Sequence, residues 1–486
     1  MPRVSLLLAV PVACVFACGD ATGPPLPVTL DVTASDTIQV TGGTLTFTAV
    51  ARDSTGAVVP GVAITWSVDD PGRGQITADG VFTAGPGAGG LLVRATAAEA
   101  GLAESVAVRA VVPGTVKWTW AAAEVGGKMP ILGGPALGMD GTAYVLVETG
   151  RFPDFGGTAV ALSPDGTIRW NQPLTQVSIC NGIVVTPGSE QLWIAGARLY
   201  LLSATGQLIW DTLRAVDPYP AVVPDFLGGA ASSDLLVAAW GKHVIAYDAA
   251  DHAFRWVSQL APLVSWLVPP TITADGRVLA KLSADTLFVF DGADGRILRT
   301  FQDPDTGVNK RVWGHGTVPV GARYYLPTRQ RLAAYDTSGT LAWLTEDTGS
   351  GMTEPAVGAD GTLYVQTRGF GLQARNPDGT VRWSRPGGPR WSWHGGPALA
   401  QGGIVYAAGA DRFFAYDTAG TLLWQFLADS AGVNQPFLGS PGIAPDGTVY
   451  SWTSTHLYAF WASAPPEPNS PWPMWRHDAQ RTGWAR

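Results

Sequence analysis

One short pattern recurs eight times in this chain and constrains its fold more than any other feature. Each copy is a strand-like run that ends at a shared position, which we call the docking position. Seven copies have a Trp there: Trp118, Trp170, Trp210, Trp256, Trp343, Trp383 and Trp424. The remaining copy, "DGRILR", has Arg299 at this position. From Trp170 to Trp424 the copies lie about 40–46 residues apart, the length of one four-stranded blade of a β-propeller.

Composition agrees with an all-β fold and limits the class of partner. Charged residues make up 14% of the chain, which has 60 Gly, 37 Pro and 20 Trp. This mixture is poor in helix-forming residues and rich in turn residues and large aromatics. The formal net charge of −8, without clustered Lys and Arg, argues against nucleic acid as a partner.

The strands that precede each docking position predict an eight-bladed ring, with seven blades as the alternative count. Similar first strands and turns recur, as in "GGPALGMDGTAYV" at 133–145 and "GSPGIAPDGTVYS" at 439–451. The last copy has a third strand at 457–461 but no outer strand, whereas "GTVKW" at 114–118 stands alone at the front. We therefore predict a propeller over 114–486 in which strand 114–118 joins the last blade. Such closure removes free sheet edges.

The N-terminus has the features of a secreted lipoprotein. Residues 1–17 contain Arg3 and then an apolar run too short to anchor stably in a bilayer, as in a signal peptide. The sequence up to Cys18 resembles a bacterial lipobox, so we expect lipidation of Cys18, with an ordinary signal peptide as the alternative. Residues 18–27 form a Pro-rich tether. Cleavage before Cys18 would leave Cys180 without a disulfide partner in the chain.

A separate small domain is expected between the tether and the propeller. Residues 28–112 contain short alternating strands separated by Gly-rich turns, the spacing of a β-sandwich. The succession "GVAITWSVDD", "GQITADGVFTAG" and "VRATA" resembles a bacterial Ig-like domain, with Trp66 as its core Trp.

Two of the repeats connect the chain to a known superfamily. "AYDTSGTLAW" at 334–343 and "AYDTAGTLLW" at 415–424 resemble the tryptophan-docking repeat of the pyrroloquinoline-quinone (PQQ)-like β-propellers. The tail "PWPMWRHDAQRTGW" at 471–484 is similar to a terminal segment common among them. The resemblance implies that each docking Trp stacks between adjacent blades and donates its indole N–H to a neighbouring carbonyl. The superfamily includes both quinone-dependent dehydrogenases and non-catalytic lipoprotein scaffolds.

The residues expected of a quinone enzyme are not recognisable in the sequence. Holding a tricarboxylated quinone over Ca²⁺ needs converging oxygen ligands, and oxidation needs a carboxylate base. The chain has no adjacent cysteines, and no cluster of Arg, Lys and Glu recurs on the inner strands. Its Asp-Gly pairs are interpreted as tight turns. We therefore predict no cofactor and no enzymatic activity.

Residues at the start of the inner strands are candidates for a site on one face of the ring. His315, Met352 and His394 come from successive blades and could bind a soft metal, although loop His residues and a core Met are the simpler interpretation. Trp313, Trp391 and Trp393 lie outside the repeat and offer flat aromatic surface to a partner. His477 and Asp478 in the tail lack a nucleophile nearby, so we expect a closing segment pinned by its aromatic residues.

These observations together predict a non-catalytic lipoprotein of the bacterial cell envelope. Its propeller would be a platform that binds a protein through face residues Trp313, His315, Trp391, Trp393 and His394. The lipid anchor would attach it to a membrane, with the outer membrane favoured, and the protein would be a monomer. A glycan-binding or surface-adhesion module is the alternative, followed by a quinone-dependent dehydrogenase. Capture of a partner, sugar binding and quinone-dependent dye reduction would distinguish the three.

Overall fold

A computed structural model of the chain separates into two compact units, Met1–Val111 and Val112–Arg486. Each unit is described by itself. The structure describes residues 25–128, 134–150, 156–175, 177, 182–196, 198–213, 228–240, 243–260, 268–281, 286–302, 316–328, 331–346, 352–367, 371–386, 396–428, 436–462 and 464–485.

The first unit consists of two four-stranded sheets. One has the order β1-β3-β6-β5 and the other β2-β8-β7-β4. Most pairs are antiparallel, but β2 pairs with β8 in parallel. A 3₁₀ turn, η1 (Ala98–Ala100), connects β7 to β8. The strands are β1 (Thr29–Ala34), β2 (Ile38–Val40), β3 (Thr44–Arg52), β4 (Thr65–Val68), β5 (Gly74–Ile76), β6 (Val81–Ala84), β7 (Gly89–Ala97) and β8 (Leu102–Val111).

The core of this unit lies between its two sheets. Strand β7 alternates buried and exposed residues, as expected of a sheet with one face on a core. Phe47 from the first sheet and Val93 from the second belong to the same buried cluster. The ring of Trp66 lies 5.9 Å from that of Phe47, centroid to centroid. The unit is thus a β-sandwich with Trp66 packed against its core, and the Ig-like assignment stays a prediction.

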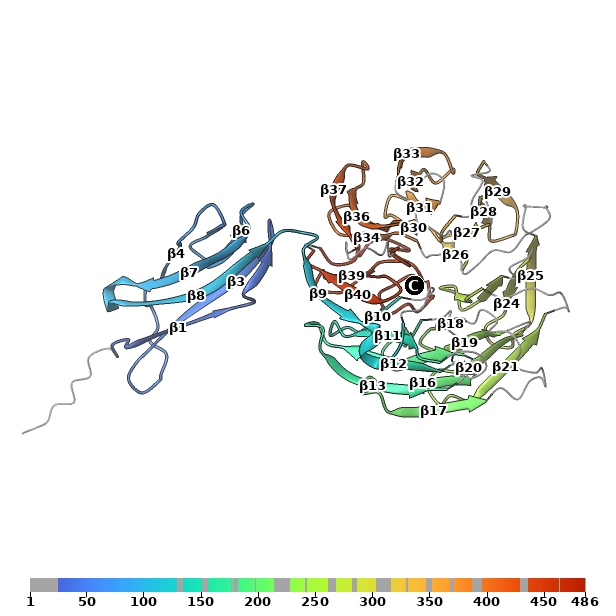
Figure 1. Cartoon of the computed structure of the whole chain (residues 1–486), viewed down its shortest axis with the longest axis horizontal. Coiled ribbons are helices and arrows are strands. Elements are labelled where there is room, and N and C mark those ends of the chain that lie inside the picture. The colour runs from blue at the N-terminus through green and yellow to red at the C-terminus, as the bar shows by residue number, and fades with distance from the viewer. Residues whose placement is uncertain are drawn as a thin grey trace, which may run out of the picture. The chain divides into compact units, whose positions relative to one another are not determined.

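The second unit contains eight four-stranded sheets in the described ranges, and Figure 1 shows them around a common axis. The all-β propeller fold predicted from the repeat is therefore found. We number the sheets as blades. Blades 1 to 4 are β10 (Ala136–Leu137), β11 (Ala143–Glu148), β12 (Gly157–Leu162), β13 (Ile168–Leu174); β14 (Val184–Val185), β15 (Leu192–Ala195), β16 (Arg198–Leu202), β17 (Leu208–Leu213); β18 (Gly228–Ala231), β19 (Leu235–Trp240), β20 (His243–Asp248), β21 (Phe254–Gln259); β22 (Thr271–Ile272), β23 (Val278–Lys281), β24 (Thr286–Phe290), β25 (Ile297–Gln302).

Blades 5 to 7 follow the same plan, and blade 8 combines strands from both ends of the unit. They are β26 (Val318–Val320), β27 (Arg323–Pro327), β28 (Leu332–Asp336), β29 (Leu341–Leu344); β30 (Ala356–Val357), β31 (Leu363–Thr367), β32 (Gly371–Arg375), β33 (Val381–Arg385); β34 (Ala398–Ala400), β35 (Ile404–Ala408), β36 (Arg412–Asp417), β37 (Leu422–Leu427); and β38 (Gly442–Ile443), β39 (Val449–Trp452), β40 (His456–Phe460), β9 (Val116–Ala121), with the 3₁₀ turn η2 (Ala122–Val125) after β9.

Burial along each blade explains its sequence pattern. Inner strands such as β12 are buried at every position and consist of apolar and small residues, because neighbouring blades cover both of their faces. Outer strands such as β13 alternate exposed and half-buried residues. Tight turns join the strands. Gly141 adopts a φ of +79°, and the Asp140 carboxylate accepts the N–H of Thr142 at 2.9 Å.

Blade 8 closes the ring through its mixed composition. Strand β9 pairs antiparallel with β40, with Trp118 opposite Ala459. The sequence placed this strand at 114–118, but the observed strand begins at Val116 and continues to Ala121. Gly114 precedes it in a left-handed conformation, with φ of +85°, and donates its N–H to the carbonyl of Trp461 at 2.8 Å. The pairing thus starts with a turn-like connection before the regular ladder.

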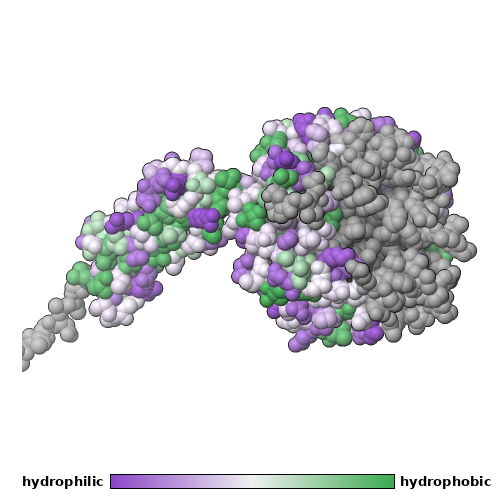
Figure 2. Space-filling view, viewed as in Figure 1, coloured by the Kyte–Doolittle hydropathy of each residue, from purple (hydrophilic) through white to green (hydrophobic). Residues whose placement is uncertain are grey.

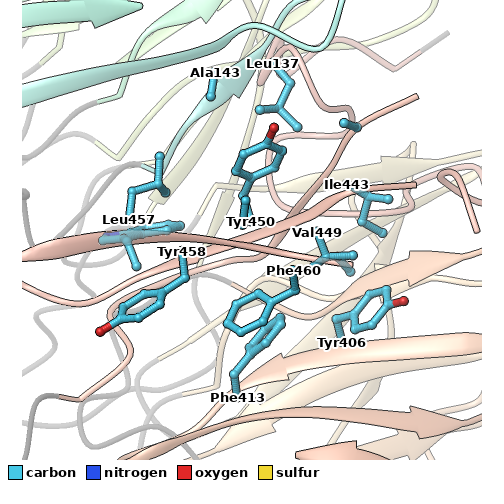
Figure 3. Close-up of a cluster of buried hydrophobic side chains, with 14 of the residues drawn as sticks. Leu137, Ala143, Tyr406, Phe413, Ile443, Val449, Tyr450, Leu457, Tyr458 and Phe460 are labelled. Carbon is cyan, nitrogen blue, oxygen red and sulfur yellow. The ribbon is translucent and has the colours of Figure 1, made fainter. Parts of the chain in front are cut away.

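The contact between blades 7 and 8 is rich in aromatic rings. Phe413 and Phe460 stack with centroids 5.2 Å apart, and Phe426 meets Phe460 edge-on at 5.0 Å. Figure 3 shows Phe413 and Phe460 beside Tyr406, Val449 and other members of this buried cluster. Such pairs stabilise beyond their buried area, so the closing blade is held by more than its backbone pairing.

Apolar and polar residues are interspersed over the described surface in the view of Figure 2. None of the helices in the described parts of the chain has the length and hydropathy needed to cross a membrane.

Candidate functional site

Most residues that the sequence proposed for a binding face lie outside the described residues. These are Trp313, His315, Trp391, Trp393 and His394, together with the lipidation candidate Cys18 and with Cys180. Met352 is described and is completely buried, in a cluster that includes Trp472 and Leu363. Its position agrees with the simpler interpretation of a core Met.

Six of the eight docking positions join a blade to the next through a hydrogen bond that the structure shows. Five docking Trp residues donate their indole N–H to a carbonyl in the turn between the third and fourth strands of the following blade. The pairs are Trp118 with Pro164 (2.8 Å), Trp170 with Ala204 (2.8 Å), Trp256 with Gly292 (2.8 Å), Trp343 with Pro377 (2.9 Å) and Trp383 with Thr418 (2.8 Å). The hydrogen bond fixes the register of adjacent blades, and the indole ring adds contact area that is buried between them.

A glycine lies against every docking Trp except Trp210. At Gly166, φ is +88°, and a Cβ added there would lie 2.7 Å from the ring of Trp118. The Trp in blade 7 meets the same residue type at the closure, since a Cβ on Gly114 would lie 2.6 Å from Trp424. The "G" of the repeat thus allows both the left-handed turn and close approach of the indole.

Blade 3 departs from this rule. His252 occupies the turn with a φ of +62°, and its ring lies 6.2 Å from that of Trp210. A non-glycine residue in this conformation is strained. The Nε2 of His252 is buried without a hydrogen-bond partner among the described residues. The contact between His252 and Trp210 therefore forms at the cost of a strained backbone and of a buried ring nitrogen that has no hydrogen bond among the described residues.

Blade 4 replaces the docking Trp by two residues that share its roles. Nη1 of Arg299 donates to the carbonyl of Ser338 at 2.8 Å, in the receiving turn of blade 5. The aromatic surface moves two residues along the strand to Phe301, whose ring stacks on Tyr335 at 5.8 Å and lies against Gly339. We call the interface between two adjacent blades a seam; the seam between blades 4 and 5 thus has both a hydrogen bond and a buried ring.

The C-terminal residues 464–485, which we call the axial segment, run along the first strands of the blades. Figure 1 places the C-terminus at the centre of the ring. The segment's carbonyls accept N–H groups from the first strands of six blades: Leu137 to Ala479, Val185 to Gln480, Ala231 to Thr482, Ile272 to Gly483, Val357 to Trp472 and Leu399 to Pro473, all at 2.8–2.9 Å. The described axis is therefore occupied by the chain itself.

Two buried arginines of the axial segment collect carbonyls that converge on the axis. Arg481 donates to Pro135, Trp475, Ser440 and Pro441 at 2.9–3.2 Å. Nη2 of Arg476 donates to the carbonyl of Gly229 at 2.6 Å. Burial lowers the pKa of each guanidinium to about 10, so both stay charged at neutral pH.

One buried carboxylate, Glu354, receives the axial segment at blade 6. Its Oε1 accepts the indole N–H of Trp472 at 3.1 Å and the backbone N–H of Arg476 at 3.0 Å. Its Oε2 accepts the N–H of Gly316 at 3.2 Å. Burial raises the pKa of Glu354, although these donors and the charge of Arg476 act in the opposite direction.

His477 and Asp478 form a local cap within the axial segment. The Asp478 carboxylate accepts the N–H of Thr482 at 2.9 Å and its hydroxyl at 2.6 Å, while Nδ1 of His477 lies 3.3 Å away. Burial would raise the pKa of Asp478, but these hydrogen bonds hold it below its usual value. Arg476, His477 and Arg481 all have left-handed backbone, so this turn stores strain.

The buried charged residues Glu354, Arg476, Asp478 and Arg481, which we call the axial cluster, are suited to holding the ring together. Its carboxylates already accept hydrogen bonds from the chain. In the described ranges, no three His, Cys, Asp or Glu side chains gather as a metal site. Sequence reasoning expected aromatic residues to pin the tail and missed Glu354, Arg476 and Arg481. One feature of the sequence could have indicated Glu354. It stands directly before a Pro at the start of a first strand, where the aligned blades have the small residues Gly134, Gly396 and Ser440.

Comparison with known proteins identifies the family. A family model described as "Outer membrane protein assembly factor BamB" matches residues 195–346 and 328–461. The two matches together cover 195–461, more than half of the chain. The chain belongs to the BamB family. Its predicted PQQ-like repeat is thereby confirmed as a BamB-type repeat.

Solved structures share the fold of this BamB family member at low sequence identity. BamB from Moraxella catarrhalis is 14% identical, with a TM-score of 0.51, and the match covers 71% of this chain and 97% of that one. The computationally designed Ika8 protein is 12% identical, also with a TM-score of 0.51, covering 69% and 98%. No curated protein sequence matches the chain.

Proposed function

We propose that this chain is a non-catalytic lipoprotein of the bacterial cell envelope whose propeller binds protein partners, as a factor in outer membrane protein assembly would. The observation that carries the proposal is the BamB-family match across the propeller repeats. The axial segment at the centre of the ring supports a structural role for this region, because Glu354 and Asp478 accept hydrogen bonds from the chain itself.

Membrane attachment through Cys18 is a separate part of the proposal. Replacement of Cys18 by Ser should shift the protein from the membrane to the soluble fraction and abolish labelling by a radioactive fatty acid. Persistent labelling of the Cys18→Ser protein would refute lipidation at this residue.

Partner binding can be tested by affinity capture from native membranes with the full lipidated protein. We expect Trp391→Ala and Trp393→Ala to reduce capture of a specific envelope protein. Phe254→Ala is the matched control, since Phe254 is an exposed aromatic residue on an outer strand, 58% accessible. Equal loss of capture in the control, or no loss in either Trp variant, would contradict binding through these Trp residues.

A further inference from the structure

The outermost strand of each blade has one edge without a sheet partner in the described sheets. Such edges can pair with another chain, and proteins commonly protect them with charged side chains. Four blades have a basic residue just before the docking position: Lys117, Arg169, Arg255 and Arg382. Lys117, Arg169 and Arg382 each form an ion pair with an Asp of their own blade. These edges are polar.

Strand β37 of blade 7 lacks this protection. Its sequence is "LLWQFL", without a charge. Leu422, Leu423 and Leu427 are 44%, 49% and 43% exposed, which makes β37 the outer strand with the most exposed leucines in the described part of the propeller. Gln425 between them is also exposed, whereas Trp424 and Phe426 are half-buried.

The backbone of β37 presents hydrogen-bonding groups to solvent. Ala428, directly after the strand, donates its N–H inward to the carbonyl of Asp411, beside β36, at 3.3 Å. Alternation along an antiparallel strand therefore directs the N–H groups of Leu427 and Gln425 outward. Among the described residues, the edge thus combines main-chain groups that have no strand partner with exposed leucine side chains.

This edge is held rigidly from behind. Trp424 lies 5.7 Å from Phe413, and Phe426 lies 5.0 Å from Phe460, both within the aromatic cluster between blades 7 and 8. A strand fixed in this way loses little freedom when another strand binds to it, which favours affinity.

The size of the edge decides what can occupy it. Six residues of strand offer far less than the roughly 1,200 Å² of total buried area that a stable interface between folded proteins requires. A second rigid copy of the chain touching only here would therefore bind poorly. An extended peptide needs only main-chain hydrogen bonds and contacts for alternate side chains.

We propose that the outer edge of β37 is a docking site for an extended, uncharged peptide strand of a protein partner. The peptide pairs with the backbone at Gln425 and Leu427 and places apolar side chains against Leu423 and Leu427. This inference rests on the proposed function and deepens it by naming the partner's form, and it uses residues different from Trp391 and Trp393.

The test is fluorescence anisotropy with the full protein and an octapeptide of alternating Val and Thr that carries fluorescein on its N-terminal amine and an amide at its C-terminus. We expect saturable binding that Leu427→Lys weakens at least tenfold. Gln425→Pro should weaken it similarly, because it removes an outward N–H at an edge position that tolerates Pro. Val257→Lys on β21 is the matched control and should bind like wild type. Unchanged urea midpoints would show that the variants fold.

Each other outcome overturns the proposal. No binding by the wild type, or equal binding by all variants, would show that the edge does not take a strand. Sedimentation that reveals a dimer lost in Leu427→Lys would assign the edge to a second copy instead. Envelope-protein capture that survives Leu427→Lys but not Trp391→Ala would leave the scaffold function standing without this site.

Discussion

Glu354 should contribute more to the stability of the propeller than any exposed carboxylate, and its replacement by Ala tests the role of the axial segment. The substitution leaves three buried donors without an acceptor: the N–H groups of Gly316 and Arg476 and the indole of Trp472. At about 1 kcal/mol or more for each unsatisfied donor, and with the buried charge of Arg476 losing the opposite charge that Glu354 provides nearby, we expect a loss of about 3–5 kcal/mol.

Glu354→Gln is the matched control. Its carbonyl oxygen can still accept from Trp472 and Arg476, while the buried charge is removed and only the bond from Gly316 is lost. We expect its free energy of unfolding at neutral pH to lie between those of Glu354→Ala and wild type, because it keeps two of the three hydrogen bonds but also removes the charge near Arg476.

The pH dependence gives a second, independent readout. Burial raises the pKa of Glu354 above its unfolded value of 4.5, so the folded state binds this proton more tightly. The stability gained from that proton is fully present below the unfolded pKa and is lost as pH rises through the folded pKa. Wild type should therefore lose stability relative to Glu354→Gln as the pH rises from about 4.5 upward.

Urea unfolding followed by Trp fluorescence measures these differences. Of the 20 Trp residues, only Trp66 precedes Val112, so the signal reports almost entirely on the propeller. Glu354→Ala within about 1 kcal/mol of wild type, or a pH trend of the opposite sign, would refute the reasoning.

Three further substitutions test the seams between blades, each by urea unfolding. Trp118→Phe keeps the ring against Gly166 but removes the donor, so we expect a loss of about 1 kcal/mol; no loss would deny the hydrogen bond a role. Phe301→Ala should lower the free energy of unfolding by about 3–5 kcal/mol, and Arg299→Ala should lower it by only about 1 kcal/mol. A larger loss in Arg299→Ala than in Phe301→Ala would show that the guanidinium, and not the ring, stabilises the contact between blades 4 and 5. His252→Gly should gain about 1 kcal/mol by relieving left-handed strain, whereas His252→Ala should not; a gain in both would exclude backbone strain as the cause.

The repeat made the propeller predictable because one physical requirement, a ring with a donor meeting a glycine turn, recurs in sequence at a fixed spacing. Arg299 could not be interpreted in the same way. Its role depends on Phe301 two residues later, and the tyrosines that receive that ring lie in the next blade. His252 was hidden because its turn is one residue longer than "DTSG", so no simple alignment marks its positive φ.

The axial cluster was less predictable than the blades. Glu354 and Arg476 are more than 100 residues apart, and only the closed ring brings them together. Patterns of short period cannot show such a contact. The residues proposed for partner binding, including Trp391 and His394, lie outside the described residues, so that part of the candidate site stays a prediction.

Because β9 and β40 come from opposite ends of the second unit, blade 8 is complete only after β40 has been synthesised, and the axial contacts form only after residues 464–485 follow. A nascent chain that has reached β39 already contains all strands of blades 1 to 7 but lacks the strand that closes the ring. Closure of the propeller is therefore expected to follow synthesis of the axial segment and not to accompany synthesis of the blades.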